Sequence, residues 1–449
     1  MLSKINRRTF LQTSAFAAGA VSAGGLFVGV GQAATGHNGF APNAFFHIAP
    51  NGDTTLWCGR CEMGQGISTA LPAAVADELE VDWARVRVLQ GDADEKYGPQ
   101  NTGGSQSINT MLEPMRQAGA AGREMLIAAA AAHWGVTTDQ CEARNHQVHN
   151  TADGRKLSYG ELAASAAQLP IPDAPQLKSR AEFRYIGKPL QRHDQADIVV
   201  GERIYGADVV VPGMKYGAIT HVPVLGGKVK SVDESGLGDL KDKVQVVTLD
   251  RFERPYGSLG GVGVVADNTW TAQQALKRLK IEWDLGPNAV YNSDAYKAEL
   301  VAQVESPGQV VSERGNVDRA LEGARVRHAA TYLGGHLSHS PMEPMASCVD
   351  VGDDHCKVWA STQAPQAIQE TVGAFLGREP EAITVHVMAA GGAFGRKFKC
   401  DYVQEAAALS QAAGAPVQLT WSREEDTRTG YYHSCSAQHI AGAIDDEGN

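Results

Sequence analysis

Apolar residues along the chain recur with two different periods, which predict short strands alternating with amphipathic helices. Leu71, Val75 and Leu79 recur at the helical spacing of four residues, whereas residues 383–387 alternate as in a half-buried strand. These elements predict a mixed α/β, α+β protein with more than one domain. Strand patterns cover residues 44–57 as a hairpin, 86–89, 209–211, 229–232, 244–248, 262–265, 328–333, 346–351, 356–360, 383–387, 417–421 and 437–444, and helical patterns begin near residues 68, 107 and 365 and cover 271–279 and 401–413.

Two glycine-rich loops lie between predicted strands and helices. The first, residues 389–397, reads Ala-Ala-Gly-Gly-Ala-Phe-Gly-Arg-Lys and precedes a helix that Gly414 should end. The second, residues 101–107, opens a long helix with Pro114 near its first turn and Gly135 at its end. Such loops expose backbone N–H groups that can bind anions, although each is also compatible with an ordinary glycine turn.

Composition narrows the class of protein. Apolar residues make up 43% of the 449 residues and charged residues 20%, which is typical of a globular protein long enough for two or three domains. The formal net charge is −11, and the first 33 residues hold three basic side chains and no acidic one, so the remainder carries −11 − 3 = −14. A surface of this charge argues against nucleic acid as a partner.

The first residues resemble an export signal. Arg7 and Arg8 form a twin-arginine pattern, and an apolar segment rich in glycine and alanine follows over residues 15–30. That segment is short for a membrane anchor, which is the alternative interpretation. We expect cleavage near Ala33 or Ala34 and a periplasmic protein, membrane-associated only through a partner. Because twin-arginine export carries folded proteins, the leader also indicates a bound cofactor.

The end of the chain suggests a fragment. The last residues, Asp445–Asn449, form a hairpin turn after the strand pattern of residues 437–444, and no returning strand follows. The last strand would therefore lack a partner, and we expect a longer or split protein.

Two local patterns resemble chemical sites but have simpler interpretations. Cys58 and Cys61 have the C-x-x-C spacing of redox sites, yet the helix begins only after a further loop, which favours a local disulfide or two buried thiols. His336, His339 and Glu343 could contact one zinc ion on a helix, but nearby prolines make that helix improbable and favour a pocket-lining or structural role.

Four segments together resemble the large subunit of molybdenum hydroxylases of the xanthine dehydrogenase and aldehyde oxidase superfamily. They are residues 62–66, 101–107, 361–363 and 391–395. Residues 62–66 precede residues 391–395, whereas xanthine dehydrogenase-like proteins have the reverse order. This permuted order, with the leader, resembles the isoquinoline 1-oxidoreductase beta subunit and related periplasmic aldehyde dehydrogenases.

The resemblance implies a domain organisation with a permuted molybdopterin-binding segment and a small α/β hammerhead-like domain. The implied divisions are a twin-arginine signal peptide over residues 1–34, the permuted molybdopterin-binding segment over 35–165, a linker over 166–198, the hammerhead-like domain over 199–290 and the first part of the main molybdopterin-binding domain over 291–449.

The resemblance also implies a molybdopterin cofactor, in bacteria usually the cytosine dinucleotide, whose pterin holds the molybdenum without a protein ligand. Gln363 would hydrogen-bond the molybdenum oxo ligand, and Phe394 would lie at the substrate side. The phosphates would bind at residues 103–105, and electrons would leave through a small [2Fe-2S] subunit, with a cytochrome c as a further candidate partner. The cofactor-binding residues implied are Gly64, Gln65, Gly66, Gly103, Gly104, Ser105, Gln363, Gly391, Gly392, Ala393, Phe394, Gly395 and Arg396.

Two departures from the family pattern limit which of the family's residue roles can be assigned to this chain. Gln106 stands where relatives often have arginine, which removes one cation for a phosphate. The family's catalytic base is a glutamate in a Gly-x-Gly-Glu motif, and none occurs in these 449 residues; Glu161 follows a glycine in a different context.

Three hypotheses follow. The first is an oxidoreductase subunit that hydroxylates an N-heteroaromatic ring or oxidises an aldehyde with water-derived oxygen. The second is an inactive or half-site cofactor-binding fragment that needs a second chain for the glutamate. The third, a thiol oxidoreductase, depends on the C-x-x-C spacing of Cys58 and Cys61 alone.

Overall fold

The computed structural model describes residues 39–448, which divide into two compact units. The first unit contains the described residues up to 215 together with residues 341–420. The second contains residues 216–340 together with the described residues from 421 onward. The predicted leader, residues 1–34, lies outside the described part of the chain.

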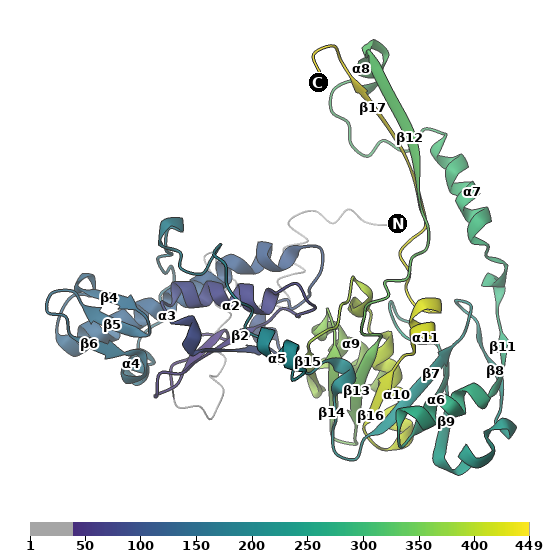
Figure 1. Cartoon of the computed structure of the whole chain (residues 1–449), viewed down its shortest axis with the longest axis horizontal. Coiled ribbons are helices and arrows are strands. Elements are labelled where there is room, and N and C mark those ends of the chain that lie inside the picture. Colours follow the sequence, from purple (N-terminus) through teal and green to yellow (C-terminus); the bar gives the residue numbers. More distant parts are fainter. Residues whose placement is uncertain (1–38, 449) are drawn as a thin grey trace. The chain divides into compact units, whose positions relative to one another are not determined.

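The N-terminal part of the first unit is a small sheet with two helices packed against each other (Figure 1). Strands β1 (Phe46–Ile48), β2 (Thr54–Cys58) and β3 (Val86–Gln90) form the sheet, with β1 antiparallel and β3 parallel to β2. Helix α2 (Ile67–Glu78) follows β2 and packs along α3 (Gln106–Trp134). The main apolar core of this part lies between the sheet and the helices.

Two glycines permit the close approach of α3. A β-carbon on Gly119 would lie 2.6 Å from the carbonyl oxygen of Val75, and one on Gly122 would lie 2.4 Å from the Phe46 ring. Glycine inside a helix costs about 1 kcal/mol relative to alanine, so close packing must offset that cost here.

Helix α3 corrects one expectation from the sequence. It begins at Gln106, so Pro114 lies in its third turn and not near its first. The start itself agrees with the pattern, which begins near residue 107, and the N-cap Ser105 adopts the left-handed conformation that ends the preceding loop. The predicted stop is confirmed, since Gly135 caps the helix with φ of 67°.

A second small sheet follows α3. Strands β4 (Cys141–Arg144), β5 (Gln147–Asn150) and β6 (Lys156–Ser158) are antiparallel in that order. Helix α4 (Tyr159–Ala166) buries Tyr159 against the main core, and the short helix α5 (Gln195–Val200) comes later in the chain.

The later part of the first unit is a four-stranded arrangement in the order β15-β14-β13-β16. Strands β14 and β15 are parallel and joined by helix α9, whereas β13 is antiparallel to both of its neighbours. Helix α10 packs against β13 and β16. The bounds are β13 (Ala346–Val351), β14 (Cys356–Ser361), α9 (Pro365–Leu376), β15 (Ile383–Met388), α10 (Asp401–Ala413) and β16 (Val417–Thr420).

The second unit contains three antiparallel strands in the order β7-β10-β9, with helix α6 packed on β10. Its core joins α6 to apolar residues of these strands. The predicted strand at residues 209–211, in the first unit, is absent, since those residues have no regular secondary structure and precede a turn at residues 212–213. The bounds in the second unit are β7 (Lys215–His221), β8 (Lys228–Asp233), β9 (Val244–Leu249), β10 (Gly261–Ala266), α6 (Thr269–Arg278), β11 (Lys280–Asp284), α7 (Ser293–Val304), α8 (Val317–Gly323), β12 (Val326–Gly334), α11 (Arg423–Arg428) and β17 (Ser436–Ile444).

The final strand has a partner, contrary to the expectation from sequence. Strands β12 and β17 form a two-stranded antiparallel ribbon in continuous register from Val326–Ile444 to Gly334–Ser436 (Figure 1). The pairing joins segments about a hundred residues apart, so the strand pattern at the end of the chain could not reveal it. The argument for a fragment from an unpaired last strand is therefore wrong.

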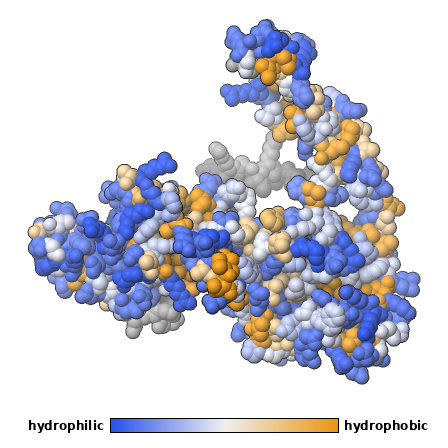
Figure 2. Space-filling model, viewed as in Figure 1, coloured by the Kyte–Doolittle hydropathy of each residue, from blue (hydrophilic) through white to orange (hydrophobic). Residues whose placement is uncertain are grey.

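Exposed apolar side chains gather on helix α5. Residues Ile198, Val199 and Val200 are 38%, 77% and 67% exposed. Figure 2 shows hydrophobic surface in the region where Figure 1 labels α5. Among the described residues, no helix has both the length and the apolar character that crossing a membrane requires.

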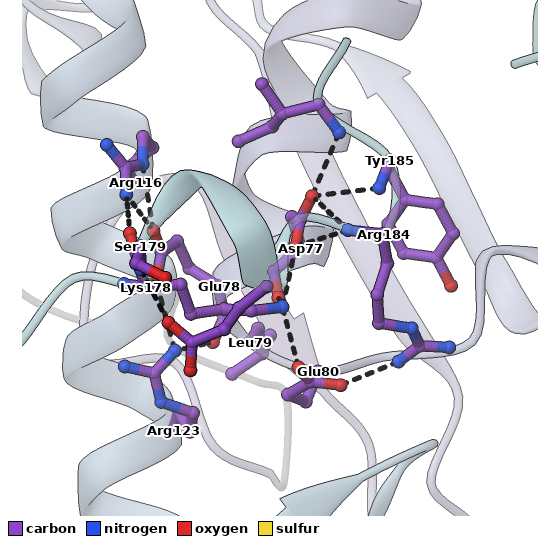
Figure 3. Close-up of polar contacts among 12 residues, drawn as sticks. Asp77, Glu78, Leu79, Glu80, Arg116, Arg123, Lys178, Ser179, Arg184 and Tyr185 are labelled. Atoms are coloured by element: carbon purple, nitrogen blue, oxygen red, sulfur yellow. Dashed lines mark hydrogen bonds and ion pairs between the residues drawn. The ribbon is translucent and has the colours of Figure 1, made fainter. Parts of the chain in front are cut away.

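The segment interpreted as a linker is fixed to the C-terminal end of α2 by buried charges (Figure 3). The carboxylate of Asp77 accepts hydrogen bonds from the backbone N–H groups of residues 184–186 and from Lys178 Nζ, the latter at 2.7 Å. Burial alone would raise the pKa of Asp77, but the donors from Ile186 and Lys178 lower it below its ordinary value. This carboxylate therefore stays ionised and anchors the segment.

Glu78 and Glu80 extend the same network (Figure 3). Glu78 is fully buried and pairs with Arg116 and Arg123 of α3 at 2.7 and 3.0 Å, while Glu80 pairs with Lys178. Carboxylates at a helix C-terminus oppose the helix dipole, so these cations supply the compensation that the helix end needs.

We predict that Asp77→Asn loosens the segment around residues 184–186. Breaking a buried ion pair costs about 3–5 kcal/mol, so amide hydrogen exchange of this segment should rise on the order of a hundredfold at neutral pH. Because the pKa of Asp77 is lowered in the folded protein, its carboxylate contributes fully to stability at pH values above the ordinary carboxyl pKa. This contribution is lost as the pH falls through the lowered pKa of the folded state.

The matched control is Asp153→Asn, which changes an exposed pair with Arg155. It should leave exchange everywhere unchanged, since exposed ion pairs contribute little. Equal exchange at residues 184–186 in wild type and Asp77→Asn would contradict the anchoring role.

Candidate cofactor site

The glycine-rich loop 389–395 and Gln363 meet because they follow neighbouring parallel strands. Strand β14 ends at Ser361 and β15 ends at Met388, and these two residues are partners in the register. The carboxyl ends of adjacent parallel strands lie at one edge of a sheet, so the segments that follow them converge.

The side-chain amide of Gln363 joins the two glycine-rich loops. Its Nε2 donates to the carbonyl oxygen of Thr102 at 2.8 Å, and its Oε1 accepts from the N–H of Gly395 at 3.0 Å. The N–H of Thr102 donates in turn to the carbonyl oxygen of Gln363. A primary amide has two N–H groups and two lone pairs on oxygen, so one of each remains for a ligand.

Glu343 holds the loop 389–395 from behind. Its carboxylate accepts from the N–H groups of Gly391 and Ala207 at 2.9 and 3.0 Å, and it pairs with the fully buried ammonium of Lys397. A β-carbon on Gly391 would lie 2.6 Å from that of Glu343, so only glycine permits this approach.

Two of the three side chains that could have contacted one zinc ion, His336 and Glu343, have other partners. Glu343 has the structural contacts just described, and His336 Nε2 lies 2.6 Å from the Tyr291 hydroxyl. Among residues 39–448, no three or more histidine, cysteine or acidic side chains are grouped to hold a metal ion. The structural role favoured from the sequence is thus confirmed for Glu343.

Phe394 occupies a strained and exposed position within the loop. Its φ of 54° lies in the left-handed region, which costs an aromatic residue on the order of 1 kcal/mol, and its side chain is 70% exposed. Gly392 and Gly395 on either side also have positive φ. The loop conformation therefore presents a phenyl ring to whatever binds in front of it.

Glu62 organises the other predicted cofactor loop. Its carboxylate accepts from the N–H groups of Gly64, Gly66 and Ser68 and from the Ser68 hydroxyl, all within 3.0 Å. Burial alone would raise the pKa of Glu62, but these donors, Ser68 first, lower it. A general base needs a carboxylate that takes up protons near neutral pH, and Glu62 lacks that property.

The loops of residues 62–66 and 389–395, which are predicted to enclose the pterin, lie side by side. The N–H of Ala390 donates to the carbonyl oxygen of Glu62 at 3.0 Å. The Gln65 side chain, however, folds back onto its own loop, where it accepts from the N–H of Met63 and donates to the carbonyl oxygen of Cys61.

A cavity of about 630 Å³ opens beside Gln363 and the start of α3. It contains backbone from both glycine-rich loops and two cationic side chains, Arg60 and Lys399. The residues lining it are Arg60, Pro99, Asn101, Gly103, Gly104, Gln106, Thr110, Met111, Gln363, Gly395, Phe398 and Lys399.

The structure thus gathers part of the predicted set in one place. Gly103, Gly104, Gln363 and Gly395 line the cavity, whereas Arg396 forms a bidentate ion pair with Asp401 and does not line it. The remaining predicted residues, namely Gly64, Gln65, Gly66, Ser105, Gly391, Gly392, Ala393 and Phe394, lie on the flanking loops outside the lining.

Sequence reasoning missed the cavity's buried cation and the carboxylates that support its loops. Arg60 is 5% exposed and lies between the two cysteines of the C-x-x-C pattern. That pattern indicated only thiol chemistry and so drew no attention to the arginine. Glycine-rich loops need outside support, but no local pattern indicates which distant carboxylate supplies it.

The seven cysteines are all free and buried within the described residues. Burial raises the pKa of both Cys58 and Cys61 to about 12, so both are neutral thiols at physiological pH. Of the two simpler interpretations of Cys58 and Cys61, two buried thiols are confirmed and a local disulfide is wrong.

Comparison with known proteins identifies the family. Two protein-family models, each described as a molybdopterin cofactor-binding domain, match residues 11–211 and 302–449 of this chain. The chain belongs to the molybdenum hydroxylase family. Isoquinoline 1-oxidoreductase subunit beta of Brevundimonas diminuta is 28% identical over 98% of this chain and 62% of that protein.

The chain is also similar to a second curated protein and to a solved structure. The membrane-bound aldehyde dehydrogenase [pyrroloquinoline-quinone] of Gluconacetobacter polyoxogenes is 30% identical over 99% of this chain and 59% of that protein. This chain therefore spans about three fifths of the length of these two relatives. The crystal structure of quinoline 2-oxidoreductase from Pseudomonas putida 86 aligns with 58% of this chain and 37% of that one, with TM-score 0.46 and 21% identity.

We predict that Gly391→Ala displaces the loop from Glu343. The added methyl group would overlap the Glu343 side chain, and overpacking of this kind costs about 1–3 kcal/mol. The thermal midpoint of the transition that reports the first unit should fall by several degrees. Gly323→Ala, where no atom lies within 4 Å, is the control and should not lower the midpoint.

The thiols provide a second test. Because burial raises the pKa of Cys58 and Cys61 to about 12, neither should react with an aromatic disulfide reagent at pH 8 in the folded protein. All seven should react after denaturation. Rapid reaction of one of this pair in the native state would restore the thiol oxidoreductase hypothesis.

Proposed function

We propose that this chain is the molybdopterin-binding part of a molybdenum hydroxylase large subunit. It would hydroxylate an N-heteroaromatic ring or oxidise an aldehyde with water-derived oxygen, and pass electrons to a small [2Fe-2S] partner. The observation that carries the proposal is the cavity where Gln363 links two glycine-rich loops beside a buried guanidinium.

The residues present fit such a cofactor. A flat, anionic group needs backbone N–H donors at close range and cations, and the cavity offers Gly103, Gly104 and Gly395 together with Arg60 and Lys399. When bound, the molybdenum–pterin group supplies the acceptor of the two electrons removed from the substrate. For its tail we propose the cytosine dinucleotide, the form that the family resemblance implies for bacterial members.

The roles of this chain's own side chains follow from their contacts. Gln363 keeps one N–H and one lone pair available while its other atoms fix the loops, so it can orient a polar group at the cofactor. Phe394 presents an apolar ring from a strained loop, which suits contact with an aromatic or aldehyde substrate.

A second candidate function is cofactor binding without turnover by this chain alone. No Gly-x-Gly-Glu motif occurs in the 449 residues. Glu62 and Glu343, the acidic residues closest to the loops, are both occupied by structural hydrogen bonds and ion pairs. The catalytic glutamate would then come from additional sequence, as the relatives' greater length permits.

The twin-arginine pattern supports a periplasmic location for the enzyme, with any membrane association through a partner such as a cytochrome c. Fractionation of expressing cells tests this placement, and recovery of the folded chain only from the cytoplasm would contradict it.

We expect the purified chain to contain molybdenum and pterin, measured by metal analysis and by fluorescence of the oxidised pterin. Gln363→Ala should lower both about tenfold, because it leaves Thr102 and Gly395 without a partner and separates the loops. Gln168→Ala, an exposed glutamine outside the site, is the control.

Turnover of isoquinoline or an aldehyde with an artificial electron acceptor separates the two candidates. Activity of the chain alone would support the complete enzyme and contradict our interpretation of the missing glutamate. Bound cofactor without turnover would favour the half-site function, and a chain without molybdenum or pterin would contradict both.

A further inference from the structure

Arg60 is a buried cation without a carboxylate partner. Three cationic side chains of the first unit are at most 5% exposed: Arg60, Arg396 and Lys397. Arg396 pairs with Asp401 and Lys397 with Glu343, but no acidic residue among residues 39–448 forms an ion pair with Arg60.

The guanidinium of Arg60 is only partly satisfied by neutral groups. Its Nη1 donates to the carbonyl oxygen of Asn101, and its Nη2 donates to the Thr110 hydroxyl at 2.9 Å. Its Nε has no hydrogen-bond partner within the described part of the chain. A guanidinium has five N–H groups, so three remain for a ligand.

The burial of such a charge is costly unless a ligand compensates it. A guanidinium remains protonated even where burial lowers its pKa, as it does here, so Arg60 cannot avoid the cost by losing a proton. A buried, unpaired charge is destabilising, and proteins ordinarily provide a counter-charge. The counter-charge of Arg60 must therefore come from outside these residues.

The cavity next to Arg60 is suited to an anion for a second reason. Helix α3 begins there, and its N-cap residue Ser105 makes no side-chain capping hydrogen bond. The first N–H groups of a helix and the positive end of its dipole favour negative charge. Gln106 at the start of the helix is neutral and lines the same cavity, so the formal charge comes from Arg60 and Lys399.

We propose that Arg60 binds the phosphate groups of the cofactor's tail, in concert with the N-terminus of α3. This inference rests on the proposed function and assigns to Arg60 the cationic role that Gln106 cannot perform. Two sources share this chemistry, the bridging diphosphate of a dinucleotide and the single phosphate of a mononucleotide pterin. A planar guanidinium with three available N–H groups can contact two oxygens of either.

The test compares Arg60→Met and Arg60→Lys with wild type, and Arg87→Met, an exposed arginine of β3, is the matched control. Full-length chains from a host that lacks pterin synthesis are titrated with inorganic pyrophosphate and with phosphate. Arg60→Met should bind pyrophosphate at least tenfold more weakly, Arg60→Lys should be intermediate, and Arg87→Met should match wild type. Tighter binding of pyrophosphate than phosphate would identify the diphosphate, and equal affinity the single phosphate.

A second measurement uses chains purified with their cofactor. The amount of nucleotide that acid releases per chain, whether or not the chain holds molybdenum, should be at least tenfold lower in Arg60→Met than in wild type. In Arg87→Met it should remain at the wild-type level. Without any anion, Arg60→Met should melt no lower than wild type, because it removes an uncompensated buried charge.

The outcomes separate this inference from the proposed function. Unchanged pyrophosphate affinity and nucleotide content in Arg60→Met would overturn the role of Arg60 and leave the proposed function intact. A lower melting midpoint with unchanged affinity would likewise overturn it by assigning Arg60 a structural role. A wild-type chain with no pterin contradicts the proposed function, whereas its Arg60-dependent pyrophosphate affinity would still support the anion site.

Discussion

Buried carboxylates fix the glycine-rich loops on which the candidate site depends. A loop without side chains cannot hold its own conformation, because glycine has more conformational freedom to lose than any other residue. Glu62 fixes one loop through the N–H groups of Gly64 and Gly66, and Glu343 fixes another through Gly391. The donors around Glu62 lower its pKa, so that it remains ionised, and both carboxylates are occupied in holding their loops.

Gln363 joins the loop that Glu343 supports to the loop of residues 101–107. Its amide contacts Thr102 and Gly395, which are nearly three hundred residues apart in sequence. Parallel pairing of β14 and β15 places Gln363 at the same edge of the sheet as Gly395. The sheet therefore brings the two segments together, and the hydrogen bonds of the Gln363 amide link them. The site is consequently sensitive to changes that separate the loops, even where these changes touch no ligand.

The sequence predicted features with local causes and missed those with distant ones. Helices α3 and α10 end at Gly135 and Gly414 as predicted, because a left-handed cap is a property of glycine itself. The position of Pro114 near the first turn of α3 was predicted wrongly, and so was the absence of a partner for β17, whose pairing depends on a segment about a hundred residues away. Glu343 was assigned a structural or pocket-lining role, but its partner Gly391 lies 48 residues away and could not be identified.

The net charge of the chain and the charge of its cavity have opposite signs. An excess of negative charge over 449 residues acts through solvent, where salt screens it beyond about 10 Å. Arg60 acts at contact distance in a poorly hydrated setting, where one unpaired cation and the end of α3 outweigh distant carboxylates. An acidic protein can therefore bind a phosphate-bearing ligand, and the acidic surface would then discourage nonspecific binding of nucleic acid while the buried arginine selects an anion small enough to enter.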